Sequence, residues 1–562
     1  MRNNLSVGPI RTTSDERISE AGSIEPPVPP VSALGDDLAV PTEVPPSGAA
    51  AFTRNSVLSV GRLLISTLVA LVLPAYLTHR LPVKTYSAWV LILQMSAYVG
   101  YLDFGIQTGI AKYVAEFEAR GDHVGAGMRA SAGLLLMLGS SCAGIVLTLV
   151  LAWRVPVLFH AMPSALYRDV RISLLFVGIS LSVGMLCSIC SAVFLGLQRY
   201  GVPMLLSLVN RFLFTGAVVA AVFLHSSLAV MGAMVGAVNL ATGALQIVAW
   251  RRLGAGIRLS LRGLDRGLVR QMLQFCSALA IWTVGMLCVS GLDLTIVGRY
   301  DFGQTAFYSI ATGPTNFMIS ILGAALAPLL PTASAESVHR GPKAMGEMLS
   351  RATRYSTILL VLSGLPLLVG GYWLLRLWVG PTYAAGTIGY LRILVLANVI
   401  RNLCLPYAGM LLATESQKVA IAGASAEAMV NVGASVYLAR HIGAIGVAYG
   451  TLLGAFVGVG MHFAVSMHYT YPKLSISRAR LFLNGMLRPS AIAIPTVILF
   501  PLWWSPGAPA FSVPLWLFWG ASTVLLAWFG ALSPEERARL LRFVKRGAHT
   551  FELAFSRSLS GR

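Results

Sequence analysis

Charged residues are scarce in this chain of 562 residues: they make up 11% of the sequence, whereas hydrophobic residues make up 56%. Because a typical soluble domain carries about 25% charged residues, this composition excludes a soluble globule with a polar surface. The apolar stretches are too long and too many for one globular core, and they predict a polytopic membrane protein. They do not alternate strictly between polar and apolar residues, which favours spanning helices over a barrel.

Catalytic and cofactor motifs are absent from the sequence as well. It contains no GxxxxGK[ST], HExxH or GxSxG pattern, and no loop long enough to form a catalytic domain. The six cysteines all lie in apolar segments, and the pair Cys187 and Cys190 has no second CxxC or His pair nearby, so packing is the better interpretation of both. We therefore expect neither enzymatic activity nor a cofactor nor a metal.

Fourteen apolar segments approach the length of about 20 residues that a helix needs to cross a bilayer. They lie at 55–78, 86–108, 129–152, 171–195, 203–224, 228–250, 272–298, 305–330, 355–378, 387–412, 417–438, 443–468, 489–504 and 513–531. The sequence thus predicts an all-α polytopic membrane protein with about 14 transmembrane helices.

Acidic residues are few: 22 Asp and Glu face 42 Lys and Arg, which leaves a net charge of +20. The basic residues gather in loops after even-numbered spans, whereas the loops after spans five and thirteen contain none. The loop positions are Arg251, Arg252, Arg258, Arg262, Arg266, Arg270, Arg340, Lys343, Arg351, Arg354, Lys473, Arg478, Arg480 and Arg488. The positive-inside rule then predicts that both termini are cytoplasmic, and the charge gives no reason to expect a nucleic acid partner.

Two stretches about 220 residues apart resemble each other. Leu77–Glu116 and Ile296–Glu336 both run from an arginine through a short linker and aromatic residues to an apolar segment that ends in Ala-Glu. Since each copy would hold six helices, both face the same way, which predicts a parallel repeat about a pseudo-twofold axis along the membrane normal. A helix pair at the C-terminal end falls outside this repeat.

The composition divides the chain into six parts. Residues 1–52 are rich in Pro, Ser and acidic residues, and they predict a disordered cytoplasmic tail. The other parts are an N-lobe at 53–253, a basic cytoplasmic linker at 254–270, a C-lobe at 271–471, a helix pair at 472–532 and a basic cytoplasmic tail at 533–562.

Ionisable residues inside the spans are the candidate functional residues, because each costs at least about 2.5–3.5 kcal/mol at a helix centre. Such residues either line a polar cavity or form a buried ion pair between helices. Because arginines outnumber acids and a guanidinium matches phosphate, we expect an anionic cargo. The candidates are Arg62, Arg211 and Arg401 for substrate binding, and Asp293 and Glu427 for ion or proton coupling. Prolines 314, 328, 331 and 366 are expected to interrupt spans eight and nine around such a cavity.

Five segments resemble one known family. They are HRLPVKTYSAW (79–89), LDFGIQTGIAKYVAEFEARGD (102–122), GLQRY (196–200), LDLTIVGRYDFGQTAFYSIA (292–311) and IGAIGVAYGTLLG (442–454). Together they resemble Wzx-type polysaccharide, or lipid-linked oligosaccharide, flippases of the multidrug/oligosaccharidyl-lipid/polysaccharide exporter superfamily. The chain departs from the family at Leu81-Pro82, where members have Leu-Gly, and in its extra helix pair and long N-terminal tail.

The resemblance implies a protein of the bacterial inner membrane that moves a polyprenyl-diphosphate-linked glycan from the cytoplasmic to the periplasmic leaflet by alternating access. It implies a diphosphate contact at Arg62, and a glycan polymerase and co-polymerase as further partners. Alternatives remain open: a cation-coupled drug antiporter of the same superfamily, a non-transporting scaffold of a glycan synthesis complex, and a membrane glycan polymerase or ligase.

Overall fold

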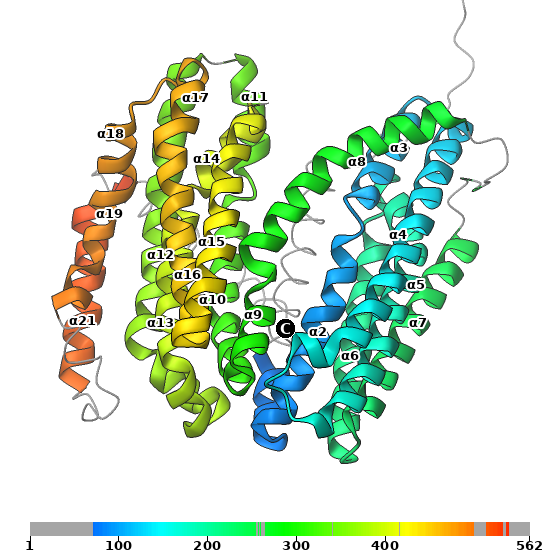
Figure 1. Cartoon of the computed structure of the whole chain (residues 1–562). Coiled ribbons are helices and arrows are strands. Elements are labelled where there is room, and N and C mark those ends of the chain that lie inside the picture. The colour runs from blue at the N-terminus through cyan, green and yellow to red at the C-terminus, as the bar shows by residue number, and fades with distance from the viewer. Residues whose placement is uncertain are drawn as a thin grey trace, which may run out of the picture. The chain divides into compact units, whose positions relative to one another are not determined.

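The computed structural model describes residues 71–253, 257, 259, 265–339, 341–414, 416–498, 513–531 and 536–538. The described residues all belong to one compact unit of the chain. All regular structure among the described residues is helical (Figure 1). The predicted all-α class is therefore confirmed, whereas the tail predicted at 1–52 lies outside the described residues.

The first half of the chain begins with a helical stretch at 71–80, which is the described part of the first predicted span. Six helices follow: α2 (Val83–Tyr101), α3 (Ile106–Ala119), α4 (His123–Leu158), α5 (Tyr167–Gly196), α6 (Gly201–Phe223) and α7 (Leu228–Leu253). They match predicted spans two to six, with α2 and α3 sharing the second.

The second half starts with α8 (Arg266–Met286), a π-helical turn η2 (Leu287–Gly291) and α9 (Asp293–Tyr300), which together match span seven. The helices after it are α10 (Thr305–Leu326), α11 (Leu329–His339), α12 (Pro342–Val379), α13 (Pro381–Asn402), α14 (Leu405–Ala413), α15 (Ala420–Ile442), α16 (Ala444–Met461) and α17 (Met467–Leu474). The chain continues through α18 (Arg478–Arg480), η6 (Leu481–Leu487), α19 (Arg488–Ser490), α21 (Val513–Leu525) and η8 (Leu526–Ala531).

Ten helices of the described part are long and apolar enough to cross a membrane. Three further predicted spans, at 272–298, 417–438 and 513–531, are helical but are not among those ten. A polytopic helical protein is thus confirmed, and the number of about 14 spans stays a prediction.

Two of the predicted helix breaks are wrong. α10 continues through Pro314 and α12 continues through Pro366. A proline leaves a main-chain carbonyl without its donor, but nearby hydroxyls can rebuild the local hydrogen bonding. Thr312 and Thr315 lie on either side of Pro314, and their hydroxyls donate to the Ser309 and Thr312 carbonyls of α10. The break predicted near Pro328 is observed, since α10 ends at Leu326 and α11 begins at Leu329.

Long-range contacts show which loops share one end of the helices. Lys473, after span twelve, donates to the Thr414 carbonyl after span ten at 2.7 Å. At the other end, Arg299 after span seven donates to the Val157 carbonyl at the end of span three. Segments after even-numbered spans therefore meet at one end of the helices, and segments after odd-numbered spans meet at the other, as the charge pattern predicts. The membrane side that each end faces stays a prediction.

Buried apolar residues form separate clusters in the described part of the chain. One cluster joins both repeats through α2, α9, α10 and α13, with Trp89 and Tyr308 fully buried in it. A second cluster lies among α3, α4, α5 and α8, and a third among α11, α12, α14 and α17. α8 therefore packs mainly on α3 and α4, while α9, the other half of the same span, packs on α15 and α16 and equally on α2.

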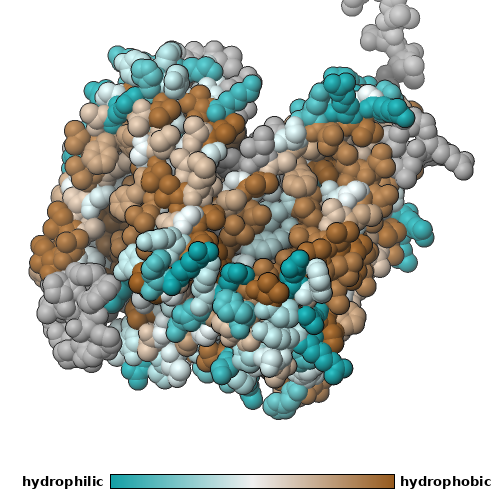
Figure 2. Space-filling view, viewed as in Figure 1, coloured by the Kyte–Doolittle hydropathy of each residue, from teal (hydrophilic) through white to brown (hydrophobic). Residues whose placement is uncertain are grey.

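The outer surface of the helices is apolar. Figure 2 shows hydrophobic side chains over the middle of the helices and hydrophilic ones gathered toward their ends. Trp153, Phe223 and Leu377 are among the large apolar side chains that are mostly exposed. A surface of this kind is stable only when lipid replaces water around it.

Candidate functional site

A buried polar cluster lies inside the C-terminal repeat, and Asp293 is one centre of it. Asp293 begins α9 directly after the π-helical turn η2, and its side chain is only 8% exposed. Its carboxylate Oδ2 accepts hydrogen bonds from the Tyr308 hydroxyl of α10 and the Thr451 hydroxyl of α16, both at 3.0 Å. A buried carboxylate is expensive without such donors, so three helices are held in register around this one group.

Arg401 and Glu427 form the second part of the cluster. Nε of Arg401, at the end of α13, donates to Oε1 of Glu427 on α15 at 2.5 Å, and the two side chains are 17% and 13% exposed. Nη2 of Arg401 is buried and has no hydrogen-bond partner among the described residues. The positive charge of Arg401 also acts on Asp293. Among the described residues, the Arg401 cation thus pairs with Glu427 and also acts electrostatically on Asp293.

Close helix packing encloses this cluster. α15 and α16 approach so closely that a Cβ on Gly458 would lie 2.5 Å from Oε2 of Glu427. One turn earlier in α16, a Cβ on Gly454 would lie 2.8 Å from the Cβ of Asn431. The Asn431 amide in turn donates to the Val289 carbonyl in η2, which the π-helical turn leaves available. The cluster thus links span seven to spans eleven and twelve.

The structure brings together three of the five predicted site residues. Arg401, Asp293 and Glu427 meet in the cluster, and the ion pair that the sequence left open as an alternative is the observed arrangement of Arg401 and Glu427. Arg211 lies apart from them, on α6 in the N-terminal repeat, where it is partly buried. Arg62 lies outside the described residues.

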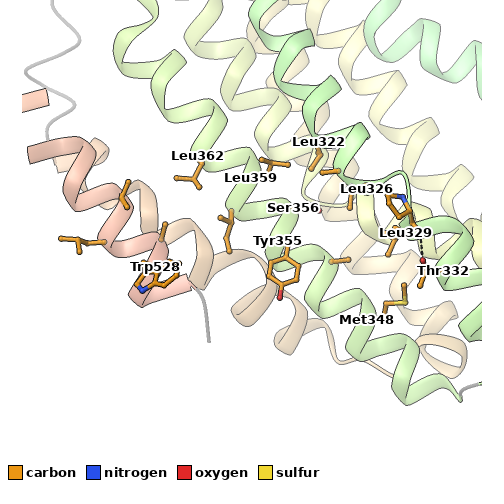
Figure 3. A pocket seen from close by; sticks show the side chains of 17 residues that line it. Leu322, Leu326, Leu329, Thr332, Met348, Tyr355, Ser356, Leu359, Leu362 and Trp528 are labelled. Atoms are coloured by element: carbon orange, nitrogen blue, oxygen red, sulfur yellow. Dashed lines mark hydrogen bonds between the residues drawn. The ribbon is translucent and has the colours of Figure 1, made fainter. Parts of the chain in front are cut away.

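An apolar groove lies between α12 and the C-terminal helix pair (Figure 3). It has a volume of about 770 Å³, within the range of about 300–1,000 Å³ typical of ligand sites. In Figure 3, Trp528 of η8 lies across from Leu359 and Leu362 of α12, while Leu322 and Leu326 close the side toward α10. The groove is lined by Leu322, Ala325, Leu326, Pro328, Leu329, Thr332, Met348, Ala352, Tyr355, Ser356, Ile358, Leu359, Leu362, Val524, Leu525, Ala527 and Trp528.

Sequence reasoning missed this groove. Its lining residues are ordinary apolar positions of a spanning helix, so no composition signal separates them from lipid-facing ones. The only available hint was the helix pair beyond the repeat, because a pair without a symmetric counterpart must pack on one lobe only. Trp519 and Ala531 of that pair do pack on Val361 and Leu365 of α12.

In the arrangement of its helices the chain is similar to solved transporters of the multidrug/oligosaccharidyl-lipid/polysaccharide exporter (MOP) superfamily. No protein-family model and no curated protein matches the chain in sequence. The superfamily expected from the sequence is thus supported at the level of the fold, and the Wzx subfamily stays a prediction.

Among solved structures, the chain is similar to the lipid II flippase MurJ in an inward closed conformation. The identity is 13%, the TM-score is 0.62, and the match covers 84% of this chain and 97% of MurJ. It is also similar to a multidrug resistance MATE family transporter of the MOP superfamily in an inward-facing conformation, at 15% identity, a TM-score of 0.57 and coverages of 72% and 96%.

A third similar structure is a MOP superfamily transporter from Pyrococcus furiosus whose binding pocket is described as having reverse polarity. Its identity is 15%, its TM-score is 0.50, and the match covers 78% of this chain and 96% of the other. At such identities the likeness establishes the fold, and the cargo has to be argued from this chain's own residues.

Proposed function

We propose that this chain is a flippase that moves a polyprenyl-diphosphate-linked oligosaccharide, such as a repeat unit of O-antigen, capsule or exopolysaccharide, between the leaflets of the bacterial inner membrane. The observation that carries the proposal is the apolar groove of about 770 Å³ between α12 and the C-terminal helix pair. A long isoprenoid chain needs an apolar path along the protein while its polar head crosses. A soluble drug needs no such path.

The arginines supply the second line of support. Arg62, Arg211 and Arg401 are proposed to attract the diphosphate and the sugar head, because a guanidinium pairs with phosphate oxygens through two parallel hydrogen bonds. Nε of Arg401 is held by Glu427, whereas its Nη2 has no hydrogen-bond partner among the described residues and is a donor that a phosphate oxygen could use. These arginines therefore favour a cargo with an anionic head.

Asp293 and Glu427 are proposed to couple transport to an ion or a proton. Two carboxylates lie near one described guanidinium, that of Arg401, so this cluster is where a cation or a proton would bind. Binding of a cation or a proton to these carboxylates would weaken their attraction to Arg401. The packing of α13, α15 and α16 would then change. The membrane potential, worth about 2.3 kcal/mol per charge per 100 mV, is a sufficient source of energy.

The test is reconstitution of the full chain into liposomes that contain a short polyprenyl-diphosphate-linked oligosaccharide with a fluorescent label on the sugar. Externally added dithionite bleaches only label in the outer leaflet. We expect the bleached fraction to exceed that of protein-free liposomes, and to fall back to it in Ala325→Phe, which fills the groove. Bleaching equal to that of protein-free liposomes would refute the proposal.

The buried acidic cluster also suits a cation-coupled drug antiporter, the second candidate function. The same liposomes separate the two candidates. An antiporter accumulates a small cationic dye when a sodium or proton gradient is imposed, and Ala325→Phe leaves that uptake unchanged because the groove takes no part in it.

A further inference from the structure

A polar cluster caps one end of the apolar groove. Nη2 of Arg354, on α12, donates to Oε1 of Glu536 at 2.6 Å, and the Tyr355 hydroxyl donates to the same oxygen at 2.8 Å. Tyr355 is also one of the residues that line the groove, and its ring is seen at the groove in Figure 3. The carboxylate of Glu536 therefore sits where the apolar lining ends.

This contact joins segments far apart in sequence, since 182 positions separate Arg354 from Glu536. The two side chains are 19% and 9% exposed, so the pair is largely withdrawn from solvent. A carboxylate held this way commonly occupies a place suited to phosphate, because both anions accept the same guanidinium hydrogen bonds.

Further arginines lie near this contact. Arg351 lies one turn before Arg354 and its charge acts on the Tyr355 hydroxyl, whereas Arg537, which follows Glu536, stacks on Phe529. Among the described residues, Arg354 is the guanidinium that is bonded to the Glu536 carboxylate. Nε of Arg354 and Nε of Arg537 are both buried without a hydrogen-bond partner among the described residues. Buried donors of this kind are costly unless a ligand uses them.

We propose that this end of the groove is a binding site for the diphosphate head of a single-chain isoprenoid lipid, and that Glu536 fills the site while the protein is empty. The inference rests on the proposed function and adds to it a second headgroup site, separate from Arg211 and the Asp293 cluster. The lipid diphosphate displaces Glu536 from Arg354, and the isoprenoid chain enters the groove beyond Tyr355. Because basic loops predict that this end faces the cytoplasm, cargo would be loaded here.

The buried guanidinium selects this occupant over an ordinary apolar ligand. Nε of Arg354 has no hydrogen-bond partner among the described residues, and Arg351 adds positive charge nearby, so an anionic head finds partners here that a neutral lipid cannot use. Displacement of a carboxylate also makes binding sensitive to the charge of residue 536, which distinguishes the site from nonspecific attraction to a basic surface.

The experiment measures binding of radiolabelled geranylgeranyl diphosphate to the full-length protein in detergent, with geranylgeraniol and inorganic diphosphate as the comparison probes. For Glu536→Gln we expect tighter binding of geranylgeranyl diphosphate by about tenfold, since the competing charge is removed. For Arg354→Gln we expect binding weaker by at least about tenfold, with the affinity for geranylgeraniol unchanged.

Arg376→Gln is the matched control, because Arg376 lies on the same helix near its other end, where it stacks on Trp373. It should bind all three probes as the wild type does. If Arg354→Gln does not fold, the increase in Glu536→Gln decides the question alone. Equal affinities of the Glu536 variant and the wild type would overturn the inference but leave flipping in liposomes intact. Absence of any geranylgeranyl diphosphate binding to the wild type would overturn both the inference and the proposed function.

Discussion

The buried pair between Arg401 and Glu427 allows the sharpest test of the C-terminal cluster. We consider Arg401→Met and Glu427→Leu, which replace each charge by an apolar side chain of similar length. Two unit charges about 4 Å apart attract by about 4 kcal/mol at an effective dielectric constant of about 20. Removing one partner leaves the other buried and uncompensated, so each single variant should lower the free energy of unfolding by about 3–5 kcal/mol.

The double variant should behave differently. When both charges are replaced by apolar groups, no uncompensated member of the pair remains, and such exchanges are often close to neutral. Asp293 still loses the cation that acts on it, although its hydrogen bonds from Tyr308 and Thr451 persist. We therefore expect the double variant to be more stable than either single variant and less stable than the wild type.

The assay is reversible unfolding of the purified protein in mixed micelles, followed by the change in helix content as denaturing detergent is added. The four proteins form a double-mutant cycle, whose coupling free energy should be at least about 2 kcal/mol in favour of the pair. The reasoning is refuted if the losses of the two single variants sum to the loss of the double variant within about 0.5 kcal/mol, since independent residues behave that way.

Three further predictions concern helix packing, the groove and the link between the repeats. Gly450→Ala should destabilise the protein by about 1–3 kcal/mol, because the new Cβ would lie 2.5 Å from the Ser435 main-chain nitrogen. Gly460→Ala on the same helix has nothing within 4 Å and serves as the control in the same unfolding assay; an equal loss there would contradict the packing argument. Ala352→Phe should slow lipid flipping in liposomes while the unfolding free energy stays within about 1 kcal/mol of wild type, because the ring occupies the groove. Tyr98→Phe removes hydrogen bonds from α2 to the Gly291 carbonyl and Thr295, so it should raise hydrogen exchange of η2 and α9 amides; unchanged exchange would show that these bonds do not hold the two repeats together.

The helical class, the positions of the spans and the repeat follow from the sequence alone. A main chain in hydrocarbon must satisfy its own hydrogen bonds, so long apolar stretches have few alternatives to helices. Where the structure describes them, the predicted spans accordingly lie mostly in helices, including α8 to α9, where Asp293 and Arg299 interrupt the apolar pattern. The candidate residues Arg401, Asp293 and Glu427 were identified for the same reason, since buried charge is costly wherever it occurs.

The glycines of the repeat illustrate the limit of such reasoning. Gly236 in α7 and Gly450 in α16 each follow a histidine, His225 or His441, that stands just before the sixth span of its copy, yet Gly236 packs against Phe176 of α5 whereas Gly450 packs against Ser435 of α15. A glycine in a spanning helix predicts a close approach but does not say to which helix. The neighbour depends on helix rotation and crossing, which the whole bundle decides.

Only the tertiary structure decided which charges meet and where an apolar cargo could lie. Arg401 and Glu427 are 26 positions apart on helices α13 and α15, and no local spacing rule pairs them. The groove depends on how the C-terminal pair packs on α12, and the contact of Arg354 with Glu536 depends on the same packing. Hydropathy determines that a segment enters the membrane, whereas shape complementarity between helices determines its partners, because lipid is as apolar as the helix surfaces themselves.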